Sequence, residues 1–90
     1  MPSETVEITN QRGLHARASA KFVGAVSKMP DDLEVKVSKD GSEVNGTSIM
    51  GLMMLGAARG DTVTIAVDGH EADAHLKKLV GLVKDGFGED

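Results

Sequence analysis

The chain has 90 residues, 40% hydrophobic and 27% charged, which is typical of one globular domain spanning residues 1–90. A net charge of −4 disfavours binding to nucleic acid or to an anionic membrane surface, and two phenylalanines without tyrosine or tryptophan offer few stacking platforms for single strands. The lack of cysteine excludes a disulfide scaffold, and without a signal peptide or an apolar span of roughly 18 residues we expect a cytoplasmic protein.

The first third of the chain contains a strand pattern followed by a helix pattern. Val6 and Ile8 alternate with polar residues, which predicts a half-buried strand over residues 5–9. From residue 16 to residue 28 the period becomes helical, and Phe22 lies in its apolar stripe. Pro30 follows, and the residue before a proline is disfavoured in helical geometry, so we expect the helix to end there.

A hairpin and a short helix are predicted next. Residues 33–38 alternate between apolar and polar side chains, and a return strand follows at residues 43–45. The Asp40-Gly41 dipeptide between them is favoured in tight hairpins. Thr47 and Ser48 are both good N-cap candidates for a short helix that runs to residue 55.

The remaining residues predict a strand over 62–67 and a final helix with a regular apolar stripe from Ala72 to Val83. Residues 86–90 are expected to fray, as chain ends commonly do. The order is strand, helix, strand, strand, helix, strand, helix. It predicts an α+β domain, with a four-stranded, mainly antiparallel sheet and three helices on one face.

Residues 13–19 read Gly-Leu-His-Ala-Arg-Ala-Ser and contain the strongest functional signal. Taken alone, His15 and Arg17 could each be an ordinary surface residue. Together at a helix start they form an anion site, because the first backbone N–H groups of a helix lack partners within it. An imidazole is also a competent nucleophile near neutral pH. These residues favour a phosphoryl group carried on His15 and stabilised by Arg17.

A second stretch, residues 45–55, is rich in methionine. The methionines could fill gaps in the core, or they could form an exposed and adaptable docking surface. Ser48 is a helix cap in the simpler interpretation, but a phosphate there would add negative charge to the same surface. His70 and His75 lie about 140° apart on a helix with 100° per residue, which does not suit a metal pair, so we expect no metal and no cofactor.

With Gly13-Leu14-His15-Ala16-Arg17 and residues 45–53 at this separation, the whole chain resembles the HPr family, the histidine-containing phosphocarriers of the bacterial phosphoenolpyruvate-dependent sugar phosphotransferase system. The resemblance implies an open-faced β-sandwich with βαββαβα topology. It also implies that His15 accepts a phosphoryl group on Nδ1 (pros-phosphohistidine) from phosphorylated enzyme I and passes it to a IIA-type acceptor. The chain is then a monomeric carrier and not an enzyme.

By the same resemblance Arg17 stabilises the phosphoryl group, and Ser48 is the serine modified by HPr kinase/phosphorylase. Three residues match the family's hydrophobic docking patch: Ile49, Met50 and Met53. One residue departs from the pattern, since many relatives have proline where this chain has Ala18. Alanine is an excellent helix former, so we expect the helix start to survive.

Three other interpretations are compatible with the residues. The chain could serve a nitrogen-related regulatory phosphorelay instead of sugar uptake. It could be an interaction module regulated through Ser48 with an idle His15. A small-molecule-binding α+β domain is the third interpretation, and it requires a concave apolar pocket.

Overall fold

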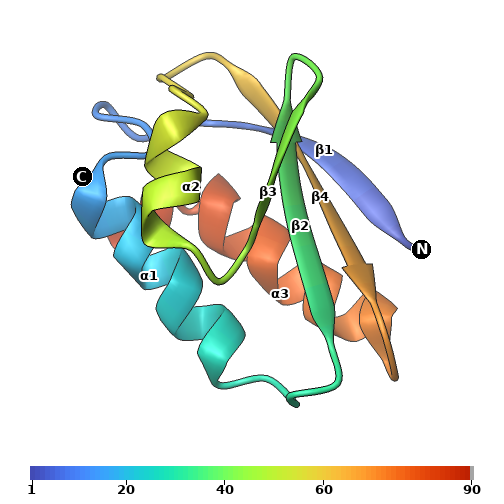
Figure 1. Cartoon of the computed structure of the whole chain (residues 1–90). Coiled ribbons are helices and arrows are strands. Elements are labelled where there is room, and N and C mark those ends of the chain that lie inside the picture. The colour runs from blue at the N-terminus through green and yellow to red at the C-terminus, as the bar shows by residue number, and fades with distance from the viewer. Residues whose placement is uncertain (90) are drawn as a thin grey trace.

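A computed structural model describes residues 1–89 of the chain and shows a four-stranded sheet with three helices packed against it (Figure 1). The elements are β1 (Ser3–Glu7), α1 (Ala16–Ser27), β2 (Glu34–Lys39), β3 (Ser42–Asn45), α2 (Ile49–Met54), β4 (Thr62–Asp68), α3 (Ala72–Lys84) and a 3₁₀ turn, η1 (Gly86–Gly88). The predicted βαββαβα order is confirmed. Within residues 1–89 no helix is long and apolar enough to cross a membrane.

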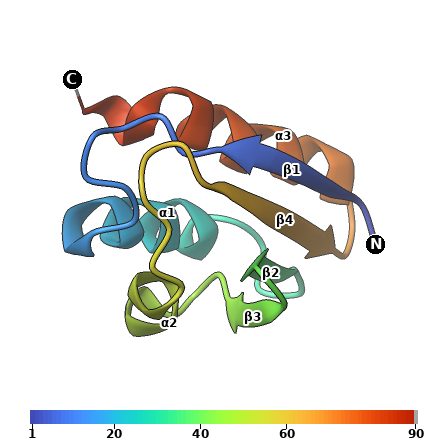
Figure 2. The same ribbon diagram turned by 90° about the horizontal axis from the view of Figure 1, so that it is seen from above.

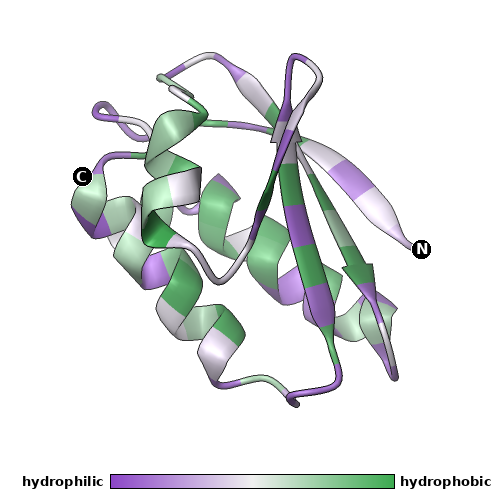
Figure 3. Cartoon of the chain, viewed as in Figure 1, coloured by the Kyte–Doolittle hydropathy of each residue, from purple (hydrophilic) through white to green (hydrophobic). Residues whose placement is uncertain are grey.

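The strands are arranged in the order β1-β4-β2-β3, and each neighbouring pair is antiparallel. Residues that alternate in sequence therefore lie on opposite faces, and in β4 Val63, Ile65 and Val67 are buried while the residues between them are more exposed. Figure 3 shows the same alternation along β2. The apolar face is covered by the helices, as the view from above shows (Figure 2), which confirms the predicted two-layer α+β architecture.

The hairpin between β2 and β3 is the one that the sequence predicts. Lys39 pairs with Ser42, so only Asp40 and Gly41 form the connection. Both have positive φ, +50° and +85°, the backbone of a two-residue turn that matches the right-handed twist of the strands.

Helices α1 and α3 pack on the sheet through the predicted stripes. In α3 all of the expected residues are buried: Ala72, Leu76, Leu79, Val80 and Val83. In α1 the buried residues are Ala18, Ser19, Phe22 and Val26, whereas Val23 is only partly buried. Ala18 is fully buried in the first turn, and the helix begins at Ala16, so the departure from proline leaves the helix start intact.

The C-terminal segment does not fray, and in this respect the sequence-based expectation was wrong. Phe87 is 1% exposed, and Lys21 of α1 donates a hydrogen bond from Nζ to the Phe87 carbonyl oxygen at 2.8 Å. The Phe87 ring thus anchors the chain end beside the start of α1. Asp90, which we also expected to fray, lies outside the described residues.

Candidate phosphoryl-carrying site

Hydrogen bonds to the backbone fix the loop before α1, which carries His15. Leu14 donates its N–H to the carbonyl oxygen of Ala57 at 2.9 Å, and Asn10 donates from Nδ2 to the Gly13 carbonyl oxygen at 2.8 Å. Gly13 has φ +63°, a conformation that glycine adopts without the usual penalty. His15 then forms the N-cap of α1, and its carbonyl oxygen accepts the first helical hydrogen bond, from Ser19.

The imidazole of His15 has a different partner at each ring nitrogen. The backbone N–H of Arg17 donates to Nδ1 at 3.3 Å. The other nitrogen, Nε2, lies 2.8 Å from Oε2 and 3.1 Å from Oε1 of Glu89. The side chains of His15 and Glu89 are 16% and 14% exposed, so the pair is accessible without being fully solvated. The structure places His15 and Arg17 together at the start of α1, as predicted. The contact between His15 and Glu89 was not predicted.

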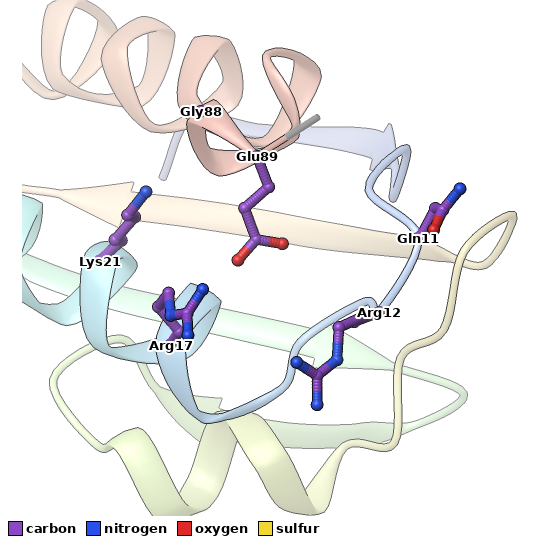
Figure 4. Close-up of a pocket in the computed structure, with 6 residues that line it drawn as sticks. All are labelled: Gln11, Arg12, Arg17, Lys21, Gly88 and Glu89. Carbon is purple, nitrogen blue, oxygen red and sulfur yellow. The ribbon is translucent and has the colours of Figure 1, made fainter.

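A polar cavity of about 310 Å³ opens beside Glu89. Its lining residues are Gln11, Arg12, Arg17, Lys21, Gly88 and Glu89. In Figure 4 the Glu89 carboxylate hangs into the cavity from the chain end, with the side chains of Arg17 and Arg12 below it. Three cationic side chains around a small open cavity suit an anion. The lining is not the apolar pocket that the small-molecule interpretation required.

The hydrogen bond with His15 lowers the pKa of Glu89 below its ordinary value. Partial burial opposes this effect, while a second hydrogen bond, from Asn10 Nδ2 at 3.1 Å, and the positive charge of Arg17 support it. Glu89 is therefore an ionised carboxylate at neutral pH.

Helix α2 lies next to α1 (Figure 1). It presents an exposed apolar surface. The exposed residues of this surface, which we call the α2 patch, are Ile49, Met50, Met53 and Met54. Leu52 is fully buried and anchors the helix. The methionines of α2 therefore do not fill core gaps. Met54, at 77% the most exposed of them, was not among the predicted docking residues, and the docking role itself stays a prediction.

Ser48 caps α2 as its simpler interpretation predicted. Its Oγ accepts a hydrogen bond from the Gly51 N–H at 2.9 Å, and the side chain is partly buried beside the α2 patch. His70 is exposed and His75 partly buried, and within residues 1–89 no three His, Cys, Asp or Glu side chains are grouped as metal ligands are.

Sequence reasoning did not find four side chains on which the charges and hydrogen bonds of the site depend: Asn10, Arg12, Lys21 and Glu89. Arg12 precedes the Gly13-Leu14-His15 motif directly, so its charge was an available signal. Asn10 supports the loop through a local hydrogen bond that its position before Gly13 could have suggested. Glu89 is 74 positions from His15, and nothing in the local sequence pattern points to that contact.

Comparison with known proteins gives one consistent result. The model of the family described as "PTS HPr component phosphorylation site" matches residues 2–85. The phosphocarrier protein HPr of Neisseria meningitidis serogroup A is 45% identical over 89 residues, 99% of this chain and 98% of that protein, and the HPr of Pseudomonas aeruginosa is 40% identical over the same shares. The crystal structure of HPr-C-His from Thermoanaerobacter tengcongensis is similar with a TM-score of 0.91 and 41% identity, covering 100% and 99% of the two chains. The chain therefore belongs to the HPr family, the phosphocarrier proteins of the phosphotransferase system.

Proposed function

We propose that this carrier accepts a phosphoryl group on Nδ1 of His15 from phosphorylated enzyme I and passes it to IIA-type acceptor proteins in the cytoplasm. Arg17 stabilises the phosphoryl group through its backbone N–H and through its guanidinium group. The partner proteins supply the rest of the catalytic machinery, so the chain itself acts as a relay component.

The observation that carries this proposal is the position of Nδ1. This nitrogen faces the backbone N–H of Arg17 at the start of α1, at 3.3 Å, and Arg17 also lines the cationic cavity. Unpaired N–H groups at a helix start bind phosphoryl oxygens, and the helix dipole favours their negative charge. A phosphoryl group on Nδ1 takes the place of the hydrogen bond from Arg17, and the Arg17 N–H can then donate to a phosphoryl oxygen.

Phosphorylation by enzyme I and phosphoenolpyruvate, followed by intact mass, tests the proposal directly. The expected result is the gain of one acid-labile phosphoryl group, which is abolished in His15→Ala and unchanged in His70→Ala, a matched change of an exposed histidine outside the site. A gain that persists in His15→Ala refutes His15 as the acceptor. Transfer from the phosphorylated carrier to a sugar-specific IIA protein and to a nitrogen-branch IIA protein, compared side by side, assigns the branch.

We propose the α2 patch as the surface on which enzyme I and the IIA proteins dock, with Ile49, Met50 and Met53 as its principal contacts. These side chains are 41%, 72% and 45% exposed and belong to one short helix, and a group of exposed apolar side chains is typical of an interaction site. Methionine is flexible and polarisable, so one patch can fit several partners. The patch lies on a helix that packs against α1, whose first residue follows His15.

Ser48 supports a second, regulatory function through HPr kinase/phosphorylase. Its hydroxyl adjoins the α2 patch, and a phosphate there adds about −1.5 to −2 charges to an otherwise apolar docking surface. Incubation with the kinase and ATP should give an acid-stable mass gain that Ser48→Ala abolishes, together with slower phosphorylation of His15 by enzyme I. A kinase that leaves Ser48 unmodified removes this function.

A further inference from the structure

The C-terminal segment is folded back so that one carboxylate reaches His15. Gly86, Phe87 and Gly88 all have positive φ, between +59° and +72°, which reverses the chain after α3. Phe87 adopts this conformation although it is not glycine, and the burial of its ring offsets the cost. The hydrogen bond from Lys21 to the Phe87 carbonyl oxygen fixes the reversal to α1. Glu89 follows immediately.

Glu89 is also tied to the loop that carries His15. The Nδ2 group of Asn10 donates both to the Gly13 carbonyl oxygen, at 2.8 Å, and to Oε1 of Glu89, at 3.1 Å. Asn10 is 2% exposed, so this bridge is shielded from water. The carboxylate is thereby held by the same side chain that shapes the turn before the histidine.

The hydrogen bonds at the two ring nitrogens of His15 are compatible with the same tautomer. An ionised carboxylate only accepts hydrogen bonds, so the proton between Glu89 and His15 belongs to Nε2. A backbone N–H only donates, so Nδ1 must present its lone pair to Arg17. Which ring nitrogen carries the proton is set by the hydrogen bond that the other makes.

We propose that Glu89 is a positioning residue that holds His15 with its proton on Nε2, so that Nδ1 carries the lone pair that attacks phosphorus once the 3.3 Å hydrogen bond from the Arg17 N–H is released. This inference rests on the proposed phosphocarrier function. It assigns a role in the relay to a side chain outside the His15 motif.

The chemical step balances with this assignment. The Nδ1 lone pair forms the new bond to phosphorus while the bond from phosphorus to the donor breaks, and that electron pair returns to the donor. No proton leaves the ring, because Nε2 keeps its own. The ring therefore gains one positive charge, which lies 2.8 Å from the Glu89 carboxylate. In the onward transfer the pair of the phosphorus–nitrogen bond returns to Nδ1 and the ring is neutral again.

The test compares Glu89→Gln with Asp85→Asn in the full chain. Asp85 is an exposed carboxylate in the same C-terminal segment, so its variant removes the same charge without touching the histidine. In ¹⁵N-labelled protein above neutral pH, the ring nitrogen shifts of His15 should report one tautomer in the wild type and in Asp85→Asn. Glu89→Gln should give a mixture, because its amide can also donate to Nε2.

The initial rate of phosphorylation by enzyme I is the second measurement. We expect Glu89→Gln to reduce this rate about tenfold, the size of effect that one lost charge-assisted hydrogen bond gives, with Asp85→Asn unchanged. Thermal unfolding by circular dichroism verifies that each variant is folded under the assay conditions. A Glu89→Gln protein with the wild-type tautomer and the wild-type rate overturns the inference.

Failure of the two proposals is distinguishable. A wild-type protein that gains no phosphoryl group on His15 refutes the carrier function. The tautomer measurement needs no enzyme I, so in that case it still decides whether Glu89 orients the ring.

Discussion

Substitution of Gly13 by alanine tests whether the turn before His15 is shaped by close packing. Gly13 has φ +63°, and an added Cβ would collide with the carbonyl oxygen of Ala57 and lie 2.8 Å from Cα of Ala58. That carbonyl oxygen is the acceptor for the Leu14 N–H. A methyl group therefore pushes apart the contact that fixes the histidine loop to the segment after α2.

The expected loss of stability in Gly13→Ala has two parts. A non-glycine residue in left-handed geometry costs about 1–2 kcal/mol, and an extra methyl group in a tightly packed place costs about 1–3 kcal/mol. Gly13→Ala should therefore lower the free energy of unfolding by about 2–5 kcal/mol, or roughly 4–8 °C in Tm for each kcal/mol in a chain of this length.

Gly56→Ala is the matched control. Gly56 has nearly the same φ, +65°, but no atom lies within 4 Å of an added Cβ. Gly56→Ala should lower the free energy of unfolding only by the cost of a non-glycine residue in left-handed geometry, about 1–2 kcal/mol. Gly24→Ala, in α1 at negative φ and also without close neighbours, should be stabilising by about 0.5–1 kcal/mol.

Urea unfolding monitored by circular dichroism gives the free energies of unfolding of the three variants. They are compared through their unfolding midpoints, with the same dependence on urea concentration (m-value) for each variant. The reasoning is refuted if Gly13→Ala and Gly56→Ala differ by less than about 0.5 kcal/mol, the scatter of ordinary surface substitutions. Equal costs mean that the loop accommodates the methyl group without strain, and that Gly13 is required only for its backbone angles.

Three further predictions concern the chain end and the α2 patch. Phe87→Ala should cost about 3–5 kcal/mol in urea unfolding because the ring is buried, and a loss below about 1 kcal/mol contradicts a docked C-terminus. Because its folded-state pKa is lowered, Glu89 contributes stability that is complete above about pH 4.5 and is lost as the pH falls through the folded-state pKa. NMR titration of its carboxyl carbon should show a lowered pKa in the wild type and a higher pKa in His15→Ala, which lacks the main cause of the shift; the same pKa in both proteins contradicts this assignment. Met50→Ala should keep the free energy of unfolding within about 0.5 kcal/mol of the wild-type value but slow phosphoryl transfer from enzyme I. Leu52→Ala, at a buried position of the same helix, should lower the free energy of unfolding by about 2–5 kcal/mol. An unchanged transfer rate in Met50→Ala excludes Met50 from docking.

The elements that the sequence predicted well are those with local signals. The α3 stripe repeats with helical period over thirteen residues, and every expected position of it is buried. Asp40-Gly41 predicts the hairpin because the two-residue turn requires positive φ at both positions, which these residue types tolerate. His15 and Arg17 were found in the same way, since the helix start that joins them is a local feature.

The chain end and Glu89 could not be predicted by this reasoning. Gly86, Gly88 and two acidic residues read as a solvated tail, with Phe87 as a lone apolar residue that periodicity cannot place. What orders the segment is long-range contact: Lys21 with the Phe87 carbonyl oxygen across 66 positions, and His15 with Glu89 across 74. Tertiary packing decided the conformation here against the local preference for disorder.

The charges around His15 suit a group that is to be passed on. In the proposed function a phosphoryl group meets cationic side chains from Arg12, Arg17 and Lys21, and the guanidinium groups are exposed, where an ion pair is worth about 0–1 kcal/mol. The helix start adds about 0.3–1 kcal/mol. Against these attractions stands the carboxylate of Glu89, which repels the phosphoryl oxygens yet stabilises the positive ring that forms with the phosphorus–nitrogen bond. In the proposed function, a site built from weak attractions and one opposing charge favours loading from enzyme I and still permits release to the next acceptor.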